Sequence, residues 1–198
     1  MATPLVSGCV AVLRQVLTEK GMSNPSAALI KAMIINGAVD IKQPVAKQGF
    51  GRVDLANSII VPGAITNKDY WENGVSKDGT VISTFPLSKY TKSLGVATTA
   101  ATNLPLVTLK ATMVYMDMAG AELQNNLNLR VTCDSKIRYG NAGKRQGADA
   151  YDMHNTFEQV VWKDLSPKTS VALEVIQYGN MHPNAGTVPF TVVWSVTK

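Results

Sequence analysis

The sequence predicts a mainly β protein with an N-terminal helical segment, in which an antiparallel β-sandwich or barrel follows the helices. Two observations carry this prediction. Residues up to about 60 show helical periodicity and helix-start signals. Later residues form short β-branched and aromatic runs that mostly alternate and are separated by Gly, Asn, Asp and Pro clusters. The turn Val61-Pro62-Gly63 marks the change and divides the chain into residues 1–62 and 63–198.

The composition indicates a folded protein and excludes several classes of function. Of the 198 residues, 45% are hydrophobic and 17% are charged, which is typical of globular domains. The net charge is +5, but Lys and Arg are scattered, and the densest pair, Lys144-Arg145, lies close to Asp149 and Asp152. A solvated surface is favoured over a nucleic-acid interface. No apolar run of membrane-spanning length lacks a charge or a breaker.

The first helix is expected from Pro4, which suits a first helical turn, to Gly21, which ends the run. Its apolar residues fall on most faces: Leu5, Val6, Cys9, Val10, Val12, Leu13, Val16 and Leu17. A helix that is apolar nearly all round is normally buried inside a larger body, and little in this chain could surround it.

A second helix is predicted over SAALIKAMIINGA, with Asn24 as N-cap, Pro25 in the first turn and Gly37 near the end. Residues 41–60 then read as a Gly-punctuated loop that leads to a short helix. The strands predicted beyond the boundary are residues 80–87, 92–98, 106–116, 127–133, 136–140, 156–162, 170–178 and 189–196.

Cysteine and histidine do not indicate a metal or redox site. Cys9 lies in the apolar helical run and Cys133 ends an apolar strand, so both are interpreted as small buried hydrophobes. His154 and His182 lie among Asn, Asp and Pro, which is typical of loop histidines.

Motifs of residues 1–62 carry a family resemblance. Met1-Ala2-Thr3-Pro4 enters the apolar helix, the ALIKAMIINGA helix follows, and Gly49-Phe50-Gly51-Arg52-Val53-Asp54 comes next. In this order they resemble the G-T-S-M-A-[ST]-P signature, the following helices and the G-x-G-x-V-[DN] turn of subtilisin-like serine proteases. The segment 1–62 would then be remnant helices of a subtilisin α/β domain.

Residues 63–198 resemble the C-terminal jelly-roll β-sandwich of some subtilases. The family patterns are L-V-W-x-D, N-D-L-D-L-x-V, Y-x-G-N and D-x-x-N-N-V-E-x-V. Their counterparts here are MVYMD at 113–117, NNLNLRV at 125–131, YGN at 139–141 and DMHNTFEQV at 152–160. The resemblance therefore covers nearly the whole chain.

This resemblance implies the C-terminal part of a serine endopeptidase. Met1 would directly follow the nucleophilic serine, so Asp, His and Ser of the triad would all lie upstream and the chain alone would be inactive. Met1, Ala2, Thr3 and Pro4 would be a remnant of the site rather than catalytic residues. The implied partners are the N-terminal catalytic portion or a protein substrate, with no nucleic acid and no membrane. The family is mostly secreted, although no signal peptide is recognised in this chain.

No cofactor is expected, apart from calcium, which sandwich domains of some subtilases bind through Asp side chains. Asp117 and Asp152 are the candidate ligands, with Asp149 and Glu158 as further possible ligands. Asn126 and Asn128 stand where the family pattern has Asp. The favoured interpretation is that these Asn and Asp residues cap turns between strands.

Two alternatives to a protease fragment are open. One is a non-catalytic β-sandwich binding module derived from a subtilase, and the other is a pseudoprotease partner that inserts into a complementary N-terminal fragment. A sugar-binding face would suit the first, but aromatic residues in strands more often belong to the core. The aromatic residues weighed for such a face are Tyr70, Trp71, Tyr90 and Tyr115.

Overall fold

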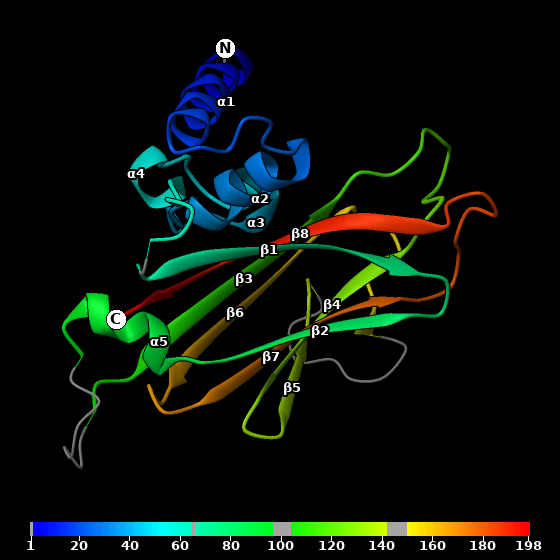
Figure 1. Cartoon of the computed structure of the whole chain (residues 1–198). Coiled ribbons are helices and arrows are strands. Elements are labelled where there is room, and N and C mark those ends of the chain that lie inside the picture. The colour runs from blue at the N-terminus through cyan, green and yellow to red at the C-terminus, as the bar shows by residue number, and fades with distance from the viewer. Residues whose placement is uncertain (1, 65, 97–103, 142–149) are drawn as a thin grey trace.

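The structure is a computed structural model that describes residues 2–64, 66–96, 104–141 and 150–198. Two four-stranded antiparallel sheets pack face to face, and a layer of helices covers the outer face of one of them (Figure 1). The prediction of a mainly β protein with an N-terminal helical segment is confirmed at this level.

The first sheet has the order β1-β8-β3-β6 and the second has the order β2-β7-β4-β5. The strands of the first sheet are β1 (Lys68–Ser76), β8 (Thr187–Thr197), β3 (Val107–Tyr115) and β6 (Phe157–Leu165). Those of the second are β2 (Thr80–Pro86), β7 (Ser170–Gln177), β4 (Leu127–Cys133) and β5 (Lys136–Tyr139).

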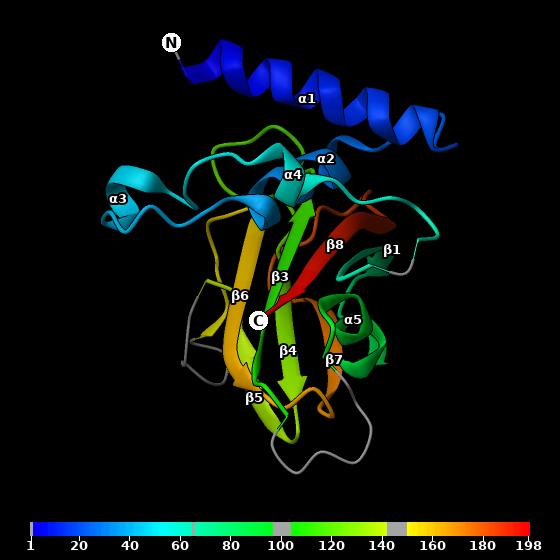
Figure 2. The same cartoon turned by 90° about the vertical axis from the view of Figure 1, so that its left-hand side faces the viewer.

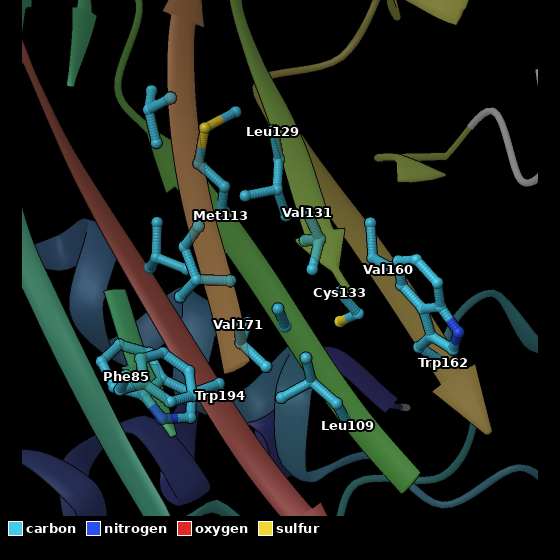
Figure 3. Close-up of a cluster of buried hydrophobic side chains, with 14 of the residues drawn as sticks. Phe85, Leu109, Met113, Leu129, Val131, Cys133, Val160, Trp162, Val171 and Trp194 are labelled. Atoms are coloured by element: carbon cyan, nitrogen blue, oxygen red, sulfur yellow. The ribbon is translucent and has the colours of Figure 1, made fainter. Parts of the chain in front are cut away.

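The main hydrophobic core lies between the two sheets. Alternate residues of each strand point inward, as period-2 geometry requires, and meet those of the facing sheet (Figure 3). Leu109 and Met113 come from β3, Leu129 and Val131 come from β4, and Trp194 comes from β8. The alternation visible in the sequence is therefore the pattern of sheet-to-sheet packing.

The helical layer consists of α1 (Ala2–Glu19), α2 (Ala27–Gly37), α3 (Val45–Gln48) and α4 (Leu55–Ser58). Figure 2 shows α1 as the outermost element, lying across α2 and α4. The N-cap of α2 is Ser26, whose hydroxyl accepts a hydrogen bond from the Leu29 N–H at 3.0 Å. The prediction of Asn24 as the cap was wrong by two residues. Ser26, directly before the first residue of α2, is also a good N-cap residue, and its hydroxyl is the acceptor that the helix uses.

A second hydrophobic core joins α2 to the first sheet. Leu29 and Met33 of α2 pack with Val114 of β3 and Val193 of β8. The buried Asn36 side chain donates to acceptors on these strands: Lys110 O at 3.0 Å, Thr112 Oγ1 at 3.1 Å and Val193 O at 3.2 Å. Segments 1–62 and 63–198 thus share a core and buried hydrogen bonds.

Two predictions about residues 63–100 need correction. The strand expected over 92–98 is wrong for 92–96. There α5 (Ser88–Thr91) is followed by a 3-10 turn, η1 (Lys92–Leu94), and then by two residues that are not in a strand. Residues 97 and 98 lie outside the described part. Strand β1 was not predicted, because Asn73 and Gly74 have low strand propensity. This segment is a strand nevertheless, because β1 pairs along its whole length with β8.

The cysteines differ in environment. Cys133 is buried in the main core, and burial raises the pKa of its thiol to about 12. Cys9 is half-buried on α1, and both cysteines are free. Separately, none of the helices in the described residues is long and apolar enough to cross a membrane.

Candidate functional site

Asp117 organises the loop that follows β3. Its carboxylate accepts hydrogen bonds from the N–H groups of Met118, Gln124 and Asn125 at 2.9, 2.7 and 3.1 Å. The Asn125 side-chain amide donates to the same carboxylate at 2.8 Å. The buried Tyr115 hydroxyl donates to Asn125 O at 2.8 Å. Asp117 therefore folds the loop back onto the start of β4.

Asp152 plays the same part in the segment before β6. It accepts from the Asn141 side chain at 2.7 Å, from the Asn155 side chain at 2.8 Å and from the His154 N–H at 2.9 Å. Burial alone would raise the pKa of Asp152. The hydrogen bonds from Asn141, Asn155 and the backbone outweigh burial, so this pKa lies below its ordinary value.

Glu158 is a carboxyl group buried at the same end of the sandwich. It is 1% exposed, and its Oε2 accepts from the Leu129 N–H of β4 at 2.7 Å. Its other oxygen, Oε1, has no hydrogen-bond partner among the described residues. Burial raises the pKa of Glu158 well above its ordinary value, and the nearby charge of Asp152 adds to this shift.

Gly140 lies directly against Glu158. A Cβ added at Gly140 would overlap the Oε2 and Cβ atoms of Glu158, so a larger residue cannot fit there unless Glu158 moves. The Gly140 N–H donates to Leu129 O at 2.8 Å, so the backbone cannot move away without breaking this contact.

We expect Gly140→Ala to lower the free energy of unfolding by about 1–3 kcal/mol, the usual range for overpacking a well-packed site. Urea unfolding followed by circular dichroism measures the change. The matched control is Gly8→Ala on α1, where an added Cβ meets nothing within 4 Å and helix propensity improves. Equal stabilities of Gly140→Ala and the wild type would contradict the close packing.

The cluster formed by Asp117, Asp152 and Glu158 with their asparagine partners does not offer a ready calcium site. Calcium takes six to eight oxygen ligands, whereas the oxygens of both Asp side chains already accept amide donors. Within the described ranges, no group of three or more His, Cys, Asp and Glu residues could hold a metal ion. The geometry is that of turn capping, and calcium binding at Asp117 and Asp152 stays a prediction. Asp149 lies outside the described residues.

The four motifs of residues 63–198 meet in this cluster. Asp117 binds the start of the 125–131 segment, Glu158 reaches Leu129, and Asn141 bonds to Asp152. His154 lies exposed in the loop before β6, in agreement with a loop role.

The remnant motif lies at the exposed end of α1. Met1 is outside the described residues, whereas Ala2, Thr3 and Pro4 form the exposed first turn of the helix. The Ser7 hydroxyl donates to Thr3 O at 3.1 Å.

Helix α1 is largely uncovered. Only Leu13 and Leu17 are buried among its described residues, while Leu5 is 72% exposed and Val12 is 43% exposed. A groove of about 340 Å³ lies between α1 and α2. It is lined by Val6, Val10, Arg14, Ala27, Ile30, Lys31, Ile34 and Ile35. An apolar groove beside exposed apolar side chains is typical of a surface that another polypeptide covers.

The aromatic residues weighed for a sugar-binding face belong mainly to the interior. Tyr115 is 0% exposed and Tyr90 is 2% exposed, while Trp71 is half-buried and packs edge-on against Phe190 at 5.0 Å. The core interpretation is confirmed for Tyr90 and Tyr115.

A different aromatic group, missed by sequence reasoning, joins Tyr139 of β5, Tyr151 of a loop and Tyr178 after β7. No sequence signal marks this group, because its members are far apart in the chain.

The fold and these sites define a β-sandwich protein with an apolar helical layer on one sheet. A scan of protein-family models and a search of curated proteins find no match. Among solved structures, the chain is similar to Aeromonas hydrophila PliG, a periplasmic lysozyme inhibitor of g-type lysozyme. The identity is 12%, the match covers 70% of this chain and 92% of that chain, and the TM-score is 0.31.

Dimeric latent PorU from Porphyromonas gingivalis is a second similar structure. The identity is 8%, the match covers 67% of this chain and 13% of that chain, and the TM-score is 0.29. The matched region is a small part of the PorU chain. Likeness at these levels carries no conclusion about function.

Proposed function

We propose that this chain is the C-terminal part of a subtilisin-like serine endopeptidase. The helical layer would complete the catalytic domain, and the sandwich would be a jelly roll that braces this domain or helps to present protein substrate. The observation that carries the proposal is α1, an 18-residue helix with apolar side chains on most faces and only two of them buried. Such a helix needs a covering body, and the upstream catalytic domain of a subtilase would supply one.

The strand order supports the jelly-roll part of the proposal. A jelly roll has eight strands in two sheets, built from two Greek keys. In the orders β1-β8-β3-β6 and β2-β7-β4-β5, the first strand pairs with the last, and the second pairs with the seventh. The contacts among the four family-like motifs are further support.

In this proposal the chemistry belongs to residues upstream of the chain. Serine attacks the peptide carbonyl, histidine moves the proton and aspartate orients the histidine, as the subtilisin template requires. This chain would contribute the start of α1, where Thr3 and Pro4 form the first turn. The positive end of a helix dipole stabilises negative charge that develops on a reacting carbonyl oxygen.

Intact-mass analysis and N-terminal sequencing of the native protein, after labelling with a fluorophosphonate probe, test the proposal. We expect a longer chain with Gly-Thr-Ser directly before Met1 and the label on that serine. An unlabelled native chain that starts at Met1 would contradict the proposal and favour the alternative, a non-catalytic binding module derived from a subtilase.

The role of α1 can be tested on the recombinant chain. We expect the double variant Leu5→Lys, Val12→Lys to keep the wild-type midpoint of thermal unfolding, because both side chains are exposed. The same variant should lose assembly with a co-expressed upstream catalytic portion, measured by co-purification and peptide hydrolysis. Thr18→Lys adds a charge at an exposed polar position of α1 and is the matched control. Assembly that survives the double variant would contradict a role for this face.

A further inference from the structure

Two adjoining cavities lie where β3 ends and β6 begins. Their volumes are about 320 Å³ and about 390 Å³. Four lining residues are common to both cavities: Ala121, Glu122, Leu123 and His154. The Tyr115 N–H donates to Thr156 O at 3.0 Å, directly beyond the last residue pair of the β3–β6 ladder. The segment after β3 and the segment before β6 therefore start side by side at these cavities.

The exposed methionines of the described residues gather at the same place. Met116 is 57% exposed, Met118 is 49% exposed and Met153 is 43% exposed. Met116 and Met118 line the larger cavity, and Met153 lines the smaller one. The other described methionines are buried or half-buried: Met22, Met33, Met113 and Met181. Outside a core, the distinctive group of a methionine is its soft, polarisable sulfur.

The larger cavity brings His154 to two of these thioethers. His154 is exposed, and its imidazole has no hydrogen-bond partner within the described ranges, where only its backbone N–H is bonded. Among the three exposed thioethers, only that of Met153 accepts a hydrogen bond in the described part of the chain, from Asn126 Nδ2 at 2.9 Å. The lining therefore offers two thioether sulfurs and one imidazole nitrogen whose lone pairs are not in use.

We propose that Met116, Met118 and His154 bind a soft monovalent cation, Cu(I), in the larger cavity. Soft thioether donors select Cu(I), and imidazole is also a copper ligand. A methionine side chain has three rotatable bonds, so its sulfur can turn toward a cation in the cavity that it lines. This inference does not rest on the proposed function, because the three ligands belong to loops of the sandwich.

Harder cations fit these donors poorly. Calcium and magnesium require oxygen ligands, and the oxygens of Asp117, the carboxylate nearest the two thioethers in the sequence, already accept N–H groups. Zinc is bound by thiolate, imidazole and carboxylate groups. No group of three or more such residues that could hold a metal ion occurs in the part of the chain that the structure describes. The donor set therefore favours a metal that accepts thioether sulfur.

The charges around the larger cavity favour a cation. Asp117 and Glu122 are in its lining, and Glu122 lines the smaller cavity as well. Lys31 is also in the lining, but its ammonium stands over the ring of Phe157, with Nζ 4.9 Å from the ring centroid. Two carboxylates and one ammonium leave the lining negative, and opposite charges attract.

Anaerobic titration of Cu(I) against bicinchoninate, a coloured Cu(I) chelator, tests this inference on the recombinant chain. All proteins carry Cys9→Ser, because the half-buried thiol on α1 would itself bind Cu(I). Cys133 is kept, since it is buried in the main core. We expect the chain to withdraw Cu(I) from the chelator.

Two methionine variants locate the site. The double variant Met116→Leu, Met118→Leu keeps the side-chain volume and removes both sulfurs, so we expect a folded protein that binds Cu(I) at least about tenfold more weakly. The matched control is Met153→Leu, which removes a thioether of similar exposure that is already hydrogen-bonded. This control should keep the affinity of the parent protein. Circular dichroism of each variant checks the fold.

Methyl NMR of methionine-labelled protein gives a second readout that requires no change at the site. Ag(I) is a soft cation that takes no part in redox chemistry, and we expect it to shift the methyl signals of Met116 and Met118. An excess of Zn(II) should leave these shifts unchanged.

Three results would overturn the inference. They are a folded chain that takes no Cu(I) from the chelator, a double variant that binds Cu(I) as tightly as its parent, and Zn(II) that displaces Ag(I) from the two methionines. These outcomes are independent of whether the native chain carries an upstream catalytic domain.

Discussion

Replacing Trp194 by alanine should lower the free energy of unfolding by about 3–5 kcal/mol, the range for removing a large buried aromatic side chain. Trp194 is 3% exposed in the main core. It stacks on Phe85 with centroids 4.9 Å apart and meets Tyr90 edge-on at 5.9 Å (Figure 3 shows Phe85 and Trp194). Phe85 belongs to β2 and Tyr90 to α5, so Trp194 of β8 links the first sheet to the second.

Urea unfolding measures the change in the free energy of unfolding, and two further variants serve as comparisons. Trp71→Ala removes the same side chain from neighbouring strand β1, where it is only half-buried, and should cost clearly less. Trp194→Phe should recover most of the loss, because it keeps a ring and removes an indole N–H with no acceptor in the described part of the chain. A loss no larger for Trp194→Ala than for Trp71→Ala would contradict the central position of Trp194.

The stability of the protein should fall as the pH rises from about 5 toward neutrality because of Glu158, and Glu158→Gln should remove this slope. The pKa of Glu158 is raised in the folded state, so the native protein holds this proton more tightly than the unfolded chain does. The stabilisation is fully present below the ordinary glutamate pKa of 4.5 and is lost as the pH rises through the raised pKa. One proton gives a slope of at most about 1.4 kcal/mol per pH unit.

The lowered pKa values of two other carboxyl groups, Asp40 and Asp152, do not add to the slope of stability between about pH 5 and neutrality. The pKa values of Asp40 and Asp152 are lowered, so their contributions are lost only below the ordinary aspartate value of 3.8. Glutamine keeps the acceptor for the Leu129 N–H and carries no charge. Urea unfolding at a series of pH values, with the exposed Glu122→Gln as control, measures the slopes. A slope that persists in Glu158→Gln would assign the pH dependence to another group.

Much of the secondary structure could be predicted from local patterns. The first helix ends where Gly21 indicates, with a left-handed φ of 93° that suits glycine. The runs 106–116 and 170–178 became β3 and β7, because alternation and β-branched residues report burial of one face. Prediction failed where strand pairing overrides propensity, as in β1, and at 92–94, where a segment predicted as a strand forms the 3-10 turn η1.

The candidate sites were less predictable than the elements. The motifs containing Asp117 and Asp152 could be identified in the sequence, but their contacts with Asn125 and Asn141 require loops from both sheets to meet. Arg130 of β4 lies opposite Glu174 of β7 only because of the strand register, and the two residues are far apart in the chain. Register is a property of the assembled sheet, so no local pattern reports it.

The sequence by itself determined most of the helices and strands, the inward-facing apolar positions of those strands and the unusual apolar character of α1. These follow from side-chain periodicity and chain stereochemistry, which act within a few residues. Only the tertiary structure decided that α1 remains uncovered, that Glu158 is buried beside Gly140, and that Met116, Met118 and His154 line one cavity. These features arise from contacts between distant segments, where packing and strand register place groups that the local sequence does not relate.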